Sequence, residues 1–87
     1  MHETALVRDV VRRIEDLARS SDARRVVGVR VWLGALSQLT AEHFREHFDI
    51  EARGTLAAGA ALDIVVSLDP HDPYAQNIRL DSVDLDE

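Results

Sequence analysis

The sequence has no cysteine and no lysine among its 87 residues, and these two absences exclude several kinds of chemistry. Without cysteine the chain forms no disulfide, carries no thiol nucleophile and offers no thiolate ligand to zinc. Without lysine it has no Walker A phosphate-binding loop and no side chain for a Schiff base. The chain is therefore neither a disulfide-stabilised domain nor a thiol or Schiff-base enzyme.

The chain also lacks a long apolar run and an excess of positive charge. No apolar segment approaches the roughly 20 residues needed to cross a bilayer. The net charge is −6, and the final 25 residues hold seven acidic side chains and only Arg79. An acidic final quarter disfavours a nucleic-acid backbone as partner. The N-terminal segment has arginines where a secretory signal would be apolar, so we expect a cytoplasmic protein with no membrane or nucleic-acid partner.

Two segments have the spacing of amphipathic helices. Residues 4–20 repeat apolar side chains at i, i+3, i+4 and i+7, which predicts a helix with one apolar stripe. The stripe consists of Val7, Val10, Val11, Ile14, Leu17 and Ala18. Residues 41–51 form the second predicted helix, with Thr40 as its N-cap and Phe44 and Phe48, four residues apart, as core anchors.

Three segments alternate apolar and polar residues as strands do, over residues 25–33, 61–68 and 78–86. In the first, Val27, Val29, Val31 and Leu33 are expected on one face; in the second, Leu62, Ile64, Val66 and Leu68. The apolar pattern of the third slips by one residue after Leu80, which predicts a bulge. Residues 69–74, Asp-Pro-His-Asp-Pro-Tyr, contain two prolines and two aspartates, which predicts a turn.

The resulting order is α-β-α-β-β in one small domain that spans residues 1–87. The first two strands are joined through a helix, which permits a parallel crossover, and the short link between the last two forces them antiparallel. The sequence thus predicts a two-layer α+β fold, with two helices packed on a three-stranded mixed β-sheet.

Four histidines are the candidate metal ligands or general bases: His2, His43, His47 and His71. Residues 43–47 match the metallopeptidase pattern H-x-x-E-H. We reject a protease, because the remaining 40 residues would have to supply a third ligand and a cleft, and the core needs Phe44. Two histidines on a solvated helix face are the simpler interpretation, while a second metal site and a small hydrolase stay open. His71, in the turn, is expected to be a surface residue.

His2 differs from the others because it lies beside the chain terminus. The α-amino group of Met1, the amide nitrogen of His2 and its Nδ1 can close adjacent five- and six-membered chelate rings. The amide of Glu3 lies within reach as a fourth planar nitrogen. Square-planar nitrogen coordination suits Ni²⁺ or Cu²⁺ better than tetrahedral Zn²⁺. Many proteins have a histidine at position 2 that binds no metal. The spacing alone therefore does not decide whether a metal binds here.

Several short motifs, in order, resemble the HypA family of nickel metallochaperones, and the resemblance covers nearly the whole chain. They are Met1-His2-Glu3 before an amphipathic helix, Ala23-Arg24-Arg25-Val26 leading to Leu33-Gly34-Ala35-Leu36-Ser37, Arg53-Gly54-Thr55, Gly59-Ala60-Ala61-Leu62-Asp63-Ile64, and the tail 78–87. The family places a cysteine-based zinc subdomain between its last two strands. Here residues 69–77 replace that subdomain with a short turn, and no cysteine is present.

The resemblance implies that Met1, His2 and Glu3 hold Ni²⁺ and that no structural zinc is bound. It implies a non-enzymatic protein that helps deliver nickel during [NiFe]-hydrogenase maturation. Its partners would be the hydrogenase large-subunit precursor, a nickel-handling GTPase accessory protein, or both. The alternative is a metal-independent adaptor of hydrogenase assembly that has kept the fold and lost nickel delivery.

Overall fold

The computed structural model describes the backbone of residues 3–86 and the side chains of residues 4–86. The elements follow one another in the order α1 (Glu3–Ser20), β1 (Arg25–Leu33), α2 (Ala41–Ala52), β2 (Ala61–Val66) and β3 (Ile78–Asp86). The predicted α+β class and element order are confirmed. Strand β2 ends two residues earlier than the sequence pattern indicates.

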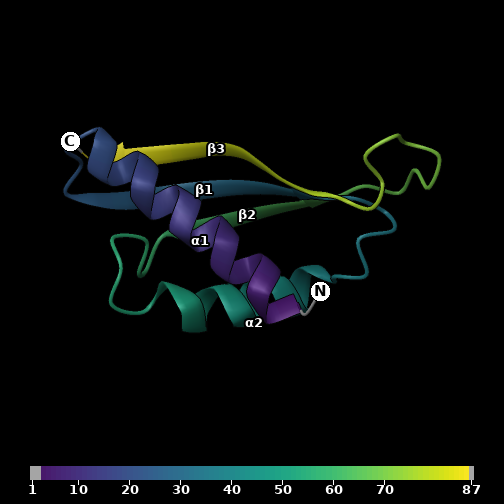
Figure 1. Cartoon of the computed structure of the whole chain (residues 1–87), viewed down its shortest axis with the longest axis horizontal. Coiled ribbons are helices and arrows are strands. Elements are labelled where there is room, and N and C mark those ends of the chain that lie inside the picture. Colours follow the sequence, from purple (N-terminus) through teal and green to yellow (C-terminus); the bar gives the residue numbers. More distant parts are fainter. Residues whose placement is uncertain (1–2, 87) are drawn as a thin grey trace.

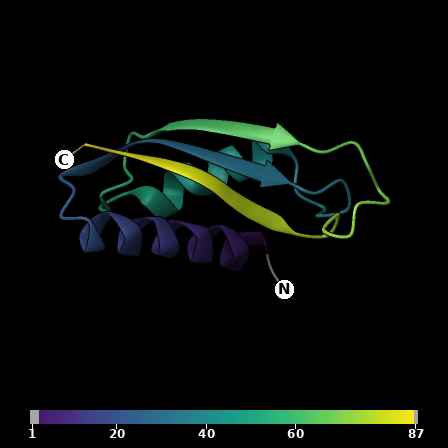
Figure 2. The ribbon, with the colours of Figure 1, turned by 90° about the horizontal axis from the view of Figure 1, so that it is seen from above.

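The three strands form one mixed sheet in the order β2-β1-β3. Strand β1 pairs in parallel with β2 and antiparallel with β3. The two helices pack on one face of this sheet, with α2 below it and α1 crossing in front (Figure 1). Because β3 lies on the far side of β1 (Figure 2), residues 67–77 cross the end of β1 instead of closing a hairpin with β2.

A bulge in β1 decides which of its valines face the helices. The pairing with β3 passes from Val26 directly to Gly28, so Val27 has no partner. As a result Val26 is 2% exposed and Val27 is 44% exposed. The expectation that Val27 shares a face with Val29 was wrong, because the extra residue reverses the alternation at this point.

A second bulge lies in β3 and confirms the predicted slip. The register passes from Arg30↔Ser82 to Val31↔Leu80, which leaves Asp81 unpaired. Leu80 and Val83 can therefore both pack against the core, although they are three residues apart.

The core lies between the sheet and the two helices. Phe44 and Phe48 are fully or almost fully buried, with their ring centroids 6.1 Å apart. The Thr40 N-cap is confirmed, since its Oγ1 accepts a hydrogen bond from the backbone N–H of His43 at 3.1 Å. The other buried hydrophobic residues are Val7, Val11, Ile14, Ala18, Val26, Val29, Val31, Leu33, Leu39, Ala52, Ala57 and Ala75.

Three further residues expected in the core are exposed. Leu17 sits at the edge of the α1 stripe, and Val66 and Leu68 lie at and beyond the end of β2. Leu62 and Ile64 pack against the core, so the alternation continues in the sequence past the part of β2 that the core covers. Across the described residues no helix combines the length and the apolar character that crossing a membrane requires.

Candidate metal centre

The sequence places the nickel ligands at Met1, His2 and Glu3. Met1, His2 and the side chain of Glu3 lie outside the described part of the chain. The structure does place the backbone of Glu3, which is the first residue of α1. The first N–H groups of a helix have no intrahelical acceptor, so the amide of Glu3 is not committed to a helical hydrogen bond. A metal that recruits this nitrogen costs α1 no backbone hydrogen bond.

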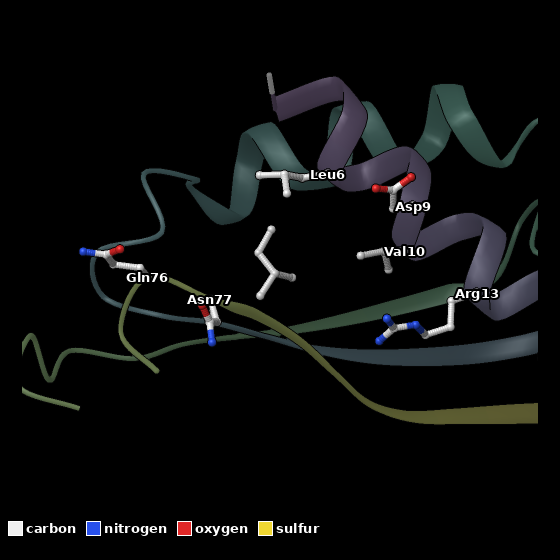
Figure 3. Close-up of a pocket in the computed structure, with 7 residues that line it drawn as sticks. Leu6, Asp9, Val10, Arg13, Gln76 and Asn77 are labelled. Carbon is white, nitrogen blue, oxygen red and sulfur yellow. The ribbon is translucent and has the colours of Figure 1, made fainter. Parts of the chain in front are cut away.

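Two adjoining cavities lie beside the first turns of α1. One, of about 310 Å³, separates α1 from the segment entering β3 (Figure 3). The second is formed with the loop after β1. Their walls are Leu6, Asp9, Val10, Arg13, Gln76, Asn77 and Ile78 in the first, and Leu6, Ala35, Leu36, Ser37, Gln38 and Gln76 in the second. The described residues of the two walls include no histidine, and together these cavities form a groove beside α1.

This groove could not be predicted from the sequence, because its residues come from three separate segments. One local feature is visible only in the backbone: Gln38 has a φ of 66°, in the left-handed region that non-glycine residues rarely adopt. This conformation turns the chain from the end of β1 towards the Thr40 cap of α2.

His43 and His47 lie one turn apart on α2, and their row continues to Glu51. His43 is exposed and His47 is half-buried. The Glu51 carboxylate lies 3.4 Å from Nε of Arg8, on α1. The row therefore lies on the flank of α2 that faces α1. The expected solvated face is confirmed for His43 and holds only partly for His47.

The H-x-x-E-H pattern does not form a closed metal centre. Phe44, inside the motif, is fully buried, while Glu46 is exposed to solvent. Among residues 4–86 there is no group of three or more histidine, cysteine, aspartate or glutamate side chains that could hold a metal ion. His71 is exposed as expected, and its backbone N–H donates to Oδ1 of Asp69 at 2.9 Å. With no cysteine in the sequence, the residues present do not fit a cysteine-based structural zinc.

Comparison with known proteins identifies the family. The model of the family described as "Hydrogenase/urease nickel incorporation, metallochaperone, hypA" matches residues 1–68. The hydrogenase maturation factor HypA of Methylocella silvestris is 46% identical over 68 residues, which are 78% of this chain and 60% of that protein. The HypA of Archaeoglobus fulgidus is 33% identical over 66 residues, 76% of this chain and 60% of its own. This chain thus spans about three fifths of the length of these curated relatives.

Solved structures extend the likeness to β3, which lies beyond the matched residues. The solution structure of the Ni metallochaperone HypA from Helicobacter pylori has a TM-score of 0.80 at 20% identity, covering 99% of this chain and 98% of that one. A second solution structure of a HypA protein has a TM-score of 0.76, also at 20% identity, covering 98% and 96%. At this identity the two structures support the fold alone. The match of the family model over four of the five elements shows that the chain belongs to the HypA family.

Proposed function

We propose that this chain binds one Ni²⁺ at Met1, His2 and Glu3 and delivers it during the maturation of [NiFe]-hydrogenase. The observation that carries the proposal is the family match, which begins at residue 1 and so includes all three residues. The relatives are named hydrogenase maturation factors, and the family description adds urease as a nickel enzyme. Nickel is the cargo of the protein in this proposal, and no reaction is catalysed.

Four nitrogens would surround the ion: the α-amino group of Met1, the amide nitrogen and Nδ1 of His2, and the amide nitrogen of Glu3. Each recruited amide loses one proton, so two amides would offset the double charge of Ni²⁺. The positive end of the α1 dipole favours those negatively charged nitrogens, although it would repel a bare cation. Reprotonation of the amides reverses the binding, and an acceptor site with stronger ligands can then take the ion.

The acceptor in this proposal is the hydrogenase large-subunit precursor, reached directly or beside a nickel-handling GTPase, in the cytoplasm. We further propose that the chain works as one domain, with residues 69–77 in the place where the family carries its zinc subdomain. Among the described residues, those that form the core of α1, α2 and the sheet are apolar and include no metal ligand, which supports folding without zinc.

Calorimetric titration with Ni²⁺ tests the proposal on protein whose α-amino group at Met1 is free. We expect about one tightly bound equivalent, with the yellow absorption and diamagnetism of square-planar Ni²⁺. His2→Ala should remove this species, while His71→Ala is the matched control and should keep it. A second form carries one or two extra residues before Met1, which convert the amine to an amide.

Equal nickel affinity and an equal yellow species in the native and extended forms would overturn the terminal site. Absence of tight nickel binding in the native form would favour the metal-independent adaptor instead. Loss of the yellow species in both the extended form and His2→Ala, with His71→Ala unchanged, would support the terminal site.

A further inference from the structure

We propose that His43 and His47 form a second metal site, in which two imidazoles on α2 chelate one divalent transition ion. Side chains four residues apart on a helix lie on one face, with Cβ atoms about 5–6 Å apart, so both rings can reach the same ion. Imidazole is a suitable ligand for zinc, copper and nickel. This inference stands on the geometry of α2 and does not depend on the proposed terminal site.

The backbone beneath the two histidines is held in place. Phe44 and Phe48 directly follow them, and both rings are buried against the core. At the start of the helix, the side chain of Thr40 accepts from the N–H of His43 at 3.1 Å, and its carbonyl accepts from the N–H of Phe44 at 3.0 Å. The chelate therefore needs no movement of the backbone, and fixed ligand positions lower the cost of binding.

The charge of α2 favours a cation at this position. The helix carries four carboxylates and one arginine, and that arginine, Arg45, donates to the carbonyl of Leu62 at 3.1 Å. Glu46 lies three residues after His43, close to the same face, and is exposed. Arg8 of α1 offsets Glu51, so the attraction comes from the other three carboxylates of the helix. The positive end of the helix dipole opposes the ion near His43, but it amounts to only about half a charge.

The described residues offer the pair no third protein ligand. Water would complete the coordination, so we expect weak and readily exchanged binding, unlike a closed structural zinc site. Both helices run in the same sense in Figure 1, and Glu51, one turn after His47, contacts Arg8 of α1. Because His43 is exposed, an ion can reach the pair from solvent.

Zn²⁺ alone is the probe that separates this site from the terminal one, because zinc does not favour square-planar coordination. Untagged protein near pH 7.5 is titrated with Zn²⁺ by calorimetry, and the histidine ring signals are followed by NMR. We expect His43 and His47 to respond together. His43→Ala and His47→Ala should each weaken the binding at least about tenfold, since losing an orienting partner of a ligand already costs 10–100-fold.

Two controls make the result specific. His71→Ala removes an exposed histidine elsewhere and should leave Zn²⁺ binding unchanged. The double variant E42H/H43A keeps two histidines on α2 but changes their spacing from four to five residues, and it should bind as weakly as His43→Ala. His47 is half-buried, so if His47→Ala fails to fold, as judged by circular dichroism without metal, His43→Ala and the double variant decide.

Wild-type Zn²⁺ affinity in His43→Ala or in the double variant would overturn the site. The two proposals can be tested separately, because each site has its own variant. His2→Ala should leave Zn²⁺ binding at the pair intact, and His43→Ala should leave the yellow nickel species intact. Loss of Zn²⁺ binding in His2→Ala would assign the zinc to the terminus and would also overturn the pair.

Discussion

Replacing Gly34 with alanine adds one methyl group where β1 meets the segment that leads into β3. A Cβ at this position would lie 2.5 Å from the carbonyl carbon of Ala75 and 2.8 Å from the oxygen of Tyr74, and closer still to the oxygen of Ala75. All three are backbone atoms, so no side-chain rotation relieves the contact. The two chain segments must move apart.

That movement is opposed by hydrogen bonds between the same segments. The N–H of Gly34 donates to the carbonyl of Asn77 at 2.9 Å, and the N–H of Leu36 donates to that of Ala75 at 2.7 Å. Overpacking a close contact typically costs about 1–3 kcal/mol and occasionally more. Weakening two hydrogen bonds adds about 0.5–1.5 kcal/mol each. We expect a total near 3 kcal/mol, or a fall in Tm of roughly 12–24 °C for a domain of this size.

Two other glycines provide matched controls with different physics. Gly54 has a φ of +77° and nothing within 4 Å of the added methyl, so alanine there should cost only the left-handed strain of about 1–2 kcal/mol. At Gly28 the nearest atom is the mobile Oδ2 of Asp84 at 3.2 Å, so alanine should change stability by no more than about 0.5 kcal/mol.

Urea unfolding followed by circular dichroism measures all three variants, and hydrogen exchange at the N–H of Leu36 reports the local opening. The expected order of destabilisation is Gly34→Ala, then Gly54→Ala, then Gly28→Ala. If Gly34→Ala cost less than Gly54→Ala, the close approach between β1 and residues 74–75 would not exist in solution.

Four further predictions follow from the described contacts and the proposed nickel site. Phe44→Ala should lose about 3–5 kcal/mol in urea unfolding, because the ring is fully buried, whereas His43→Ala should stay within about 0.5 kcal/mol; similar losses would contradict the assigned faces of α2. Thr40→Ala should cost about 0.5–2 kcal/mol through loss of the N-cap, and Thr40→Ser should restore most of it; equal stability of the two variants would argue against the cap. The protein should melt cooperatively in excess chelator, since no metal ligand lies in its core, and a non-cooperative melt would show a structural metal. Nickel affinity should fall as the pH drops from about 8 to 6, because free α-amino groups and imidazoles, with pKa values of about 7.7–8.0 and 6.5, must lose their protons to bind; affinity independent of pH would exclude these ligands.

The sequence was most informative where one local pattern decides the outcome. The apolar stripe of α1 and the spacing of Phe44 and Phe48 on α2 predicted both helices, because a helix needs one buried face whatever it packs against. The slip in β3 predicted its bulge at Asp81, since the alternation itself records the extra residue. The Thr40 cap is likewise a local contact, made within the first turn of α2.

The bulge in β1 could not be foreseen, because four consecutive apolar or small residues, 26–29, fit either face. The pairing with β3 decided that Val26 is buried and Val27 exposed. The exposure of Val66 and Leu68 was decided in the same way, by where the helices end. Each of these outcomes depends on a partner that is distant in the sequence.

The candidate sites also have some features that the sequence predicts and others that only the tertiary structure decides. The terminal motif and the spacing of His43 and His47 are properties of the sequence, because a chelate ring and a helical turn are local geometry. Only the tertiary structure decided that the row of His43, His47 and Glu51 faces α1, through the contact of Glu51 with Arg8, and that β3 crosses to the far side of β1. These placements come from packing between segments tens of residues apart, and no local spacing encodes which surfaces will meet.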